Sequence, residues 1–103
     1  MSWIVLKHGD IKDFIRKLDP IPRGKISKAI TLLRDYGPLV GMPYSKKISA
    51  DLYELRIRGR QEIRILYAIK HDQILLLNVF KKQTQKLPLR EIVTALKRLE
   101  SLT

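Results

Sequence analysis

The sequence contains no cysteine and only two histidines among its 103 residues. Without cysteine, neither a disulfide framework nor a thiolate metal site can form. His8 and His71 are too few for a histidine-rich metal cluster, and each is expected to be an exposed polar residue. Long apolar runs are missing as well. The first residues, MSWIVLKHGDIKD, resemble neither a signal peptide nor a membrane span, so we expect a cytoplasmic protein.

Acidic residues are scarce relative to basic ones. The chain has 21 Lys and Arg against 10 Asp and Glu, a formal net charge of +11. For a chain of one domain, spanning residues 1–103, this exceeds what solubility requires. It favours an anionic partner, such as nucleic acid, the ribosome, an acidic protein or a membrane surface. Charge alone does not choose among these partners.

The first third of the chain predicts one strand and two helices. Residues 2–7, SWIVLK, are typical of a short strand. A helix is expected over residues 11–18, with Asp10 at its N-cap and an Asp-Pro pair at its end. A second helix is expected over residues 22–36, ended by Gly37-Pro38. The short link between the helices predicts an antiparallel helical hairpin.

The rest of the chain predicts three strands and a closing helix. Residues 37–50 have the composition of a loop, and strands are expected over residues 51–58, 62–70 and 73–80. The last of these strands is apolar on both faces and is predicted to be the central one. Residues 88–102 carry apolar side chains at helical spacing. The predicted fold class is α+β, in the order β-α-α-β-β-β-α, with a small antiparallel sheet, a helical hairpin on one side and a C-terminal helix.

Four stretches carry a resemblance to a known family: GPLVGMPYSKKI, LYELRIRG, IRILYAI and FKKQTQKLPLREI. Together with the predicted order of elements, they resemble the RelE/ParE superfamily of bacterial toxin–antitoxin toxins, and within it the phage-derived, HigB-like branch. The resemblance covers nearly the whole chain and is densest from Gly37 to Leu99. In one small departure from the family's spacing, the lysine pair follows Phe80 directly.

The resemblance implies a RelE-like fold and a ribosome-associated endoribonuclease that cleaves messenger RNA during translation. It implies no cofactor and no metal. It also implies a protein partner, a cognate helix-turn-helix antitoxin of the HigA-like kind, in a toxin–antitoxin hetero-oligomer away from any membrane. Two alternatives stay open. A ParE-like toxin that inhibits DNA gyrase would have the same fold without cleaving RNA, and a non-enzymatic nucleic-acid-binding module would use the charge only for affinity.

Arginines at strand positions are the first candidates for chemistry. Attack of the ribose 2′-hydroxyl on its own phosphate needs a base, an acid and cations that stabilise the phosphorane. Arg56 and Arg58 share a strand face with Glu54, and Arg64 interrupts an otherwise apolar strand. Arg64 is expected either to pair with Glu54 or to clamp the scissile phosphate, and the two roles are compatible. We predict Arg64 and Arg56 as catalytic, Glu54 as orienting and Arg58 as RNA-binding.

The lysines after the last strand are the second group of candidates. Lys81 and Lys82 point to opposite faces if the strand continues, so only one of them can join Arg64. By resemblance, a basic residue just past this strand belongs to the active surface. The two-residue period favours Lys82, which we predict to be catalytic and to lie across the sheet from Arg64. Lys81, Thr84 and Lys86 are predicted as RNA-binding, and a solvated connector is the alternative.

A third group precedes or lies on the middle strands. Lys46 and Lys47 stand before the strand at residues 51–58, in a loop that borders the RNA groove in the family, and we predict them as RNA-binding. Tyr53 and Tyr67 fall on the apolar faces of their strands, where core packing is the favoured interpretation. Stacking on a base is the functional alternative, so both are kept as RNA-binding candidates. The basic residues of the helical hairpin are individually a solvated face, and together they could dock on ribosomal RNA.

Overall fold

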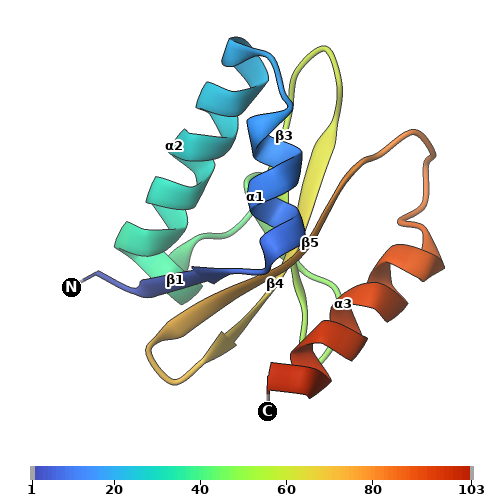
Figure 1. The fold of residues 1–103 in the computed structure, drawn as a ribbon. Helices are drawn as coiled ribbons and strands as arrows, with labels where there is room; N and C mark the ends of the chain where they lie inside the picture. Colours follow the sequence, from blue (N-terminus) through green and yellow to red (C-terminus); the bar gives the residue numbers. More distant parts are fainter. Residues whose placement is uncertain (1, 103) are drawn as a thin grey trace.

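The computed structural model describes residues 2–102 as one sheet with helices packed on both of its faces (Figure 1). In chain order its elements are β1 (Ile4–Lys7), α1 (Gly9–Arg16), α2 (Pro20–Tyr36), the 3-10 helix η1 (Gly37–Leu39), β2 (Ser45–Lys47), β3 (Tyr53–Ile57), β4 (Ile63–Lys70), β5 (Gln73–Lys81) and α3 (Leu89–Leu102). Among residues 2–102, no helix is long and apolar enough to cross a membrane. The predicted α+β class is confirmed.

The sheet has the strand order β1-β5-β4-β3-β2. Strands β2 to β5 are antiparallel to their neighbours, whereas β1 runs parallel to β5, so the sheet is mixed and the prediction of a purely antiparallel sheet was wrong. The parallel pair forms because α1 and α2 lie between β1 and the rest of the sheet in the sequence. β2 was not predicted, because three residues are too few to show a strand period. The predicted central strand, β5, is buried on both faces, but β4 occupies the middle position.

The two faces of the sheet carry two separate apolar clusters. Helices α1 and α2 form an antiparallel hairpin over one face, as predicted, and bury Ile11, Ile26 and Leu33 there (Figure 1). Helix α3 packs on β5 and β4 on the opposite face, where Ala95 and Leu99 are buried. We refer below to the hairpin face and the α3 face.

The ends of the helices follow from local hydrogen bonds. Helix α1 begins at Gly9, because the Nδ1 atom of His8 accepts a hydrogen bond from the backbone N–H of Asp10 at 3.2 Å. The prediction of Asp10 as N-cap was therefore wrong, and the side chain of Asp10 pairs instead with Arg98 of α3. Gly37 ends α2 with φ of 52°, and a Cβ there would overlap the indole ring of Trp3. Glycine is required at this position for both reasons.

Polar contacts fix α3 against β5. The guanidinium of Arg98 donates to the carbonyl of Leu77 at 2.8 Å. The side-chain amide of Asn78 donates to the backbone carbonyl of Glu91 at 3.1 Å and to its carboxylate at 3.0 Å. Leu77 and Asn78 lie where the pairing of β4 with β5 shifts register between Leu66 and Tyr67. The bulge therefore supplies backbone and side-chain groups that hold α3 over one part of its face.

Candidate functional site

Strand register places the candidate arginines on the α3 face. Leu66 belongs to the apolar cluster under α3, and it pairs with Glu54 across β3 and β4. Side chains at paired positions share a face, and positions two apart along a strand do as well. Arg56 and Arg64, which pair with each other, therefore lie on the same face as Glu54. The predicted grouping of these three residues is present in the structure.

These side chains form a chain of alternating charges. Arg56 donates from Nε to Oε1 of Glu54 at 2.9 Å, and Nε of Arg64 lies 3.4 Å from Oε2 of the same carboxylate. On its other side, Nη1 of Arg64 donates to Oε2 of Glu62 at 3.0 Å. Arg58 donates from Nη1 to Oε1 of Glu62 at 3.2 Å. Two carboxylates thus link three guanidinium groups, and we call these five residues the ion-pair cluster.

Arg64 is the deepest member of the ion-pair cluster. Its side chain is 5% exposed, and that of Glu54 is 4% exposed, whereas the side chain of Arg58 is 60% exposed. Among residues 2–102, Nε of Arg64 has no hydrogen-bond partner, because its approach to Glu54 is close enough for charge attraction but lacks hydrogen-bond geometry. The burial of Arg64 is tolerated because carboxylates flank it on two sides. Arg64 fixes positive charge beneath the surface, and Arg58 exposes positive charge to solvent.

Glu62 joins the lysine region to the ion-pair cluster. The backbone N–H of Lys82 donates to the carbonyl of Glu62 at 2.8 Å, which extends the pairing of β4 with β5 by one position. The residue across from Lys82 is therefore Glu62, and the one across from Arg64 is Phe80. The expectation that Lys82 lies directly across from Arg64 was off by two residues, although both lie on the α3 face. The hydrogen bond from Arg64, with the charges of Arg64, Arg58 and Lys82, outweighs desolvation and lowers the pKa of Glu62.

Other predicted residues lie on the hairpin face, away from the ion-pair cluster. Lys81 pairs with Ile63 and Lys47 pairs with Tyr53, and both partners pack in the cluster under α1 and α2. The structure separates Lys81 from Lys82, as the strand period predicts. Lys47 lies instead over the ring of Tyr53, with 5.8 Å between Nζ and the ring centroid.

Tyr67 lies inside the core. It is 1% exposed, it stacks on Tyr53 with ring centroids 5.3 Å apart, and its hydroxyl forms a hydrogen bond with Ser45. Burial raises the pKa of Tyr67, against the opposing effect of the Ser45 hydrogen bond. The ring offers no face to a base, and the favoured interpretation of both tyrosines as packing residues agrees with their position in or against the core.

The remaining candidates lie at the margins. Lys46 is exposed and pairs with Glu54, so its side chain lies on the α3 face beside the ion-pair cluster. Thr84 and Lys86 are exposed in the connection between β5 and α3, where the Thr84 hydroxyl donates to the Lys86 carbonyl at 2.7 Å. This bond shapes a turn, so the Thr84 hydroxyl is engaged within the loop.

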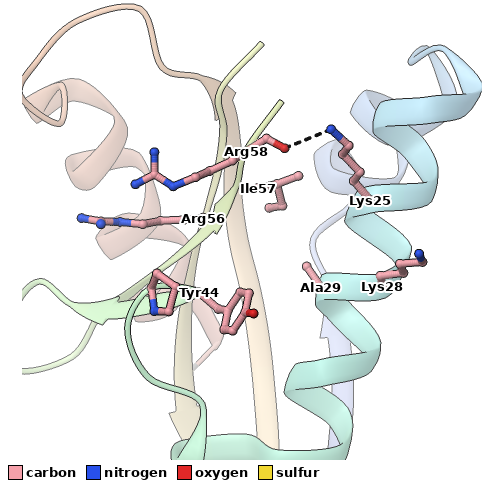
Figure 2. A pocket seen from close by; sticks show the side chains of 8 residues that line it. Lys25, Lys28, Ala29, Tyr44, Arg56, Ile57 and Arg58 are labelled. Atoms are coloured by element: carbon pink, nitrogen blue, oxygen red, sulfur yellow. Dashed lines mark hydrogen bonds between the residues drawn. The ribbon is translucent and has the colours of Figure 1, made fainter. Parts of the chain in front are cut away.

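A basic groove opens between α2 and the edge of β3 (Figure 2). It encloses about 310 Å³, with Lys25, Lys28 and Ala29 of α2 on one wall and Ile57 of β3 and Tyr44 on the other. Nζ of Lys25 donates to the backbone carbonyl of Arg58 at 3.2 Å and so ties α2 to β3. Figure 2 shows the side chains of Arg56 and Arg58 extending from β3 away from α2. Arg56 and Arg58 also line the groove, so two members of the ion-pair cluster border it.

One residue of the cluster, Glu62, was missed in the sequence. It precedes β4 by one position, and the two-residue period that placed Arg64 would also have placed Glu62 beside it. Within residues 2–102, no group of three or more His, Cys, Asp or Glu side chains is arranged to hold a metal ion.

Comparisons with known proteins bear on family and fold. The family described as "Phage derived protein Gp49-like (DUF891)" matches residues 13–100. No curated protein sequence matches the chain. Among solved structures, a free-state mutant of the E. coli toxin RelE, with two arginines replaced by alanine, matches with a TM-score of 0.72 at 17% identity, over 96% of this chain and 99% of that chain. The likeness confirms the predicted RelE-like fold. Because the family match spans most of its residues, the chain belongs to the phage-derived Gp49-like family.

Proposed function

We propose that this chain is the toxin of a type II toxin–antitoxin pair and that it cleaves messenger RNA on the ribosome. Family membership and the RelE-like fold support a toxin, since the matching solved structure is described as one. The observation that carries the nuclease proposal is the gathering of cations from four strand regions on one face of the sheet. They are Lys46, Arg56, Arg58, Arg64 and Lys82.

The proposed reaction is attack of a ribose 2′-oxygen on the adjacent phosphorus. The bond from the 2′-oxygen to phosphorus forms as the bond to the 5′-oxygen of the next nucleotide breaks. A base takes the 2′-hydroxyl proton, an acid protonates the leaving 5′-oxygen, and a 2′,3′-cyclic phosphate remains. Negative charge grows on the phosphoryl oxygens in the transition state, so fixed cations around that position accelerate the step.

The cations of the α3 face have different roles according to how deeply they are buried. Arg58 is exposed and Lys82 is half-buried, so both can reach a bound phosphate. Arg64 is held beneath them by the buried carboxylate of Glu54 and adds positive charge that does not have to be reoriented during the reaction. Glu54 orients Arg56 and Arg64 from below.

The proposal includes the partners that such a toxin requires. The substrate is messenger RNA in the ribosome, and the net charge of +11 favours association with that anionic particle. The neutralising partner is a helix-turn-helix antitoxin of the HigA-like kind, and the HigB-like branch and a cytoplasmic location stay predictions. A small helix-turn-helix reading frame beside this gene would support the pairing.

The two adjacent lysines provide a matched test. Lys82→Ala removes a cation from the α3 face, and we expect the rate of translation-dependent messenger RNA cleavage to fall by about 10²-fold, as for other groups that stabilise developing charge. Lys81→Ala removes the same charge from the hairpin face, and we expect its rate to stay near that of the wild-type protein. The measurement is cleavage of a defined messenger RNA in a translation extract, with folding checked by circular dichroism.

If the two lysine variants cleave messenger RNA at equal rates, the α3 face takes no part in the proposed mechanism. Growth arrest without any messenger RNA cleavage, together with loss of gyrase supercoiling activity, would replace the nuclease proposal with a ParE-like one. Wild-type protein that neither cleaves messenger RNA nor inhibits gyrase would leave the non-enzymatic binding module.

A further inference from the structure

Glu62 stands at the meeting point of three cations. Its Oε1 atom accepts from Arg58 at 3.2 Å and its Oε2 atom accepts from Arg64 at 3.0 Å. Lys82 is paired with it across the strands and adds a third favourable charge. The structure therefore contains an anion site with one guanidinium for each oxygen of a carboxylate.

The Glu62 carboxylate that occupies this site resembles a phosphodiester in charge and in the number of its oxygens. Both groups carry one negative charge and present two equivalent oxygens, and arginine forks bind either of them through paired N–H donors. The side chain of Arg64 is 5% exposed, and its Nη1 atom donates to the Glu62 carboxylate and, at 3.3 Å, to the carbonyl of Ile63. An RNA phosphate that binds Nη1 of Arg64 must therefore take the place of Glu62.

We propose that Glu62 is a built-in competitor of the RNA phosphate, which occupies the anion site in the free protein and leaves it when RNA binds. The inference rests on the proposed function for the identity of the ligand. In this view Arg58 and Arg64 are kept in place for the substrate by a carboxylate that mimics it. By competing with RNA, Glu62 lowers the affinity of the protein for RNA. It also raises selectivity for phosphates that contact all three cations.

The two carboxylates of the ion-pair cluster differ in the property that this role needs. Glu54 is 4% exposed and bonds Arg56 from inside the sheet face, so it cannot leave without burying unpaired charge. Glu62 is 35% exposed and stands at the end of a strand, next to solvent. Its pair with Arg58, whose side chain is 60% exposed, costs little to break. Glu62 can therefore swing into water when a phosphate arrives, whereas Glu54 stays.

The test compares charge removal at two places. Glu62→Gln removes the competing charge and keeps the size of the side chain, and Glu62→Ala removes the side chain. The control is Asp13→Asn on α1, which changes the net charge by the same amount at an exposed pair with Arg16. The probe is a short single-stranded RNA with 2′-deoxy substitutions, which binds but offers no attacking 2′-hydroxyl. Fluorescence anisotropy gives the Kd as a function of salt.

We expect both Glu62 variants to bind the RNA about three- to tenfold more tightly than the wild-type protein, because the ion pairs of a partly exposed carboxylate oppose RNA binding by only a modest free energy. The plot of log K against log salt should steepen by about 0.7, the change for one more phosphate neutralised on a single strand. Asp13→Asn should change Kd by less than about twofold. In the cleavage assay, KM should fall and kcat should be retained.

Unchanged or weaker binding by both Glu62 variants would overturn the inference, as would a fall in kcat without a fall in KM, since that result marks Glu62 as a positioning residue. An equal gain in affinity from Asp13→Asn would overturn it too, because the effect would then be that of net charge. If the wild-type protein cleaves no messenger RNA and the Glu62 variants still bind more tightly, the proposed function fails and the anion site stands.

Discussion

The two faces of the sheet are built differently. On the hairpin face, α1 and α2 cover a continuous apolar surface in which Leu55, Ile65 and Tyr67 are buried. On the α3 face, one helix covers an apolar part over β4 and β5, and the same face continues across β3 and β4 as the ion-pair cluster. One sheet therefore combines a face that stabilises the fold with a face that carries fixed charge.

The difference shows how a small domain holds charge in place. Among residues 2–102, the buried polar groups of the hairpin face are the Tyr67 hydroxyl and its partner Ser45. On the α3 face, Glu54 and Arg64 are buried, and the Nε atom of Arg64 lies 3.4 Å from a carboxylate oxygen of Glu54. Buried ion pairs add little net stability compared with apolar residues of the same volume. Their presence beside an apolar cluster that could have been extended is a reason to look for function there.

Removing the buried arginine should have the largest effect. Arg64→Ala leaves the carboxylate of Glu54 buried with one partner fewer, and we expect the free energy of unfolding to fall by about 3 kcal/mol or more. Arg58→Ala on the same face removes an exposed arginine and should cost about 1 kcal/mol or less. Denaturant unfolding of both variants measures the contrast. A similar, small loss for both variants would show that depth does not separate the two arginines.

Removing the Tyr67 hydroxyl, which is buried on the hairpin face, should have a smaller effect, and only on stability. Tyr67→Phe leaves Ser45 without its partner in the core, and we expect a loss of about 1 kcal/mol. Messenger RNA cleavage should stay at the wild-type rate, because Tyr67 is buried on the face opposite the ion-pair cluster. The double variant with Ser45→Ala should cost less than the sum of the single variants. A large loss of cleavage by stably folded Tyr67→Phe would contradict the division of the two faces.

The smallest effect should be a change in the free energy of unfolding at acidic pH. The cations around Glu62 lower its pKa in the folded protein. A carboxylate with a lowered folded pKa contributes stability above its unfolded pKa, about 4.3 for glutamate, and loses it as the pH falls through the folded value. The wild-type protein should therefore be more stable than Glu62→Gln at neutral pH, and this advantage should shrink on acidification below about pH 4. Unfolding free energies of both proteins between pH 7 and 3 test this, and a constant difference would contradict it.

The elements of the fold were largely predictable because their signals are local. Helix α3 shows its apolar stripe and a proline at its start, and β3 alternates apolar and charged residues from Tyr53 onward. The prediction failed where an element is short or where a less usual residue type caps a helix. Strand β2 has three residues, and the start of α1 depended on a histidine cap in place of the more usual aspartate.

The sheet face on which each candidate residue lies was predictable, whereas the contacts between these residues were less so. Strand period and the family resemblance together placed Arg56, Arg64 and Lys82 on one face, and the period separated Lys82 from Lys81. It did not show which residue lies across from Lys82, because that depends on the register between β4 and β5 and on its shift at Leu66. The pairing of Arg58 with Glu62 spans a turn, whose geometry the alternation of residues does not define.

By itself the sequence determined the charge of the molecule, the positions of its helices and most of its strands, and the face on which each strand residue lies. These properties depend on residues close together in the chain, through hydrogen bonds of neighbouring residues and the alternation of side chains. The tertiary structure decided that β1 runs parallel to β5, that Arg64 is buried between two carboxylates, and that Glu62 fills the anion site. Those properties depend on strand register and burial, which arise only when distant segments pack together.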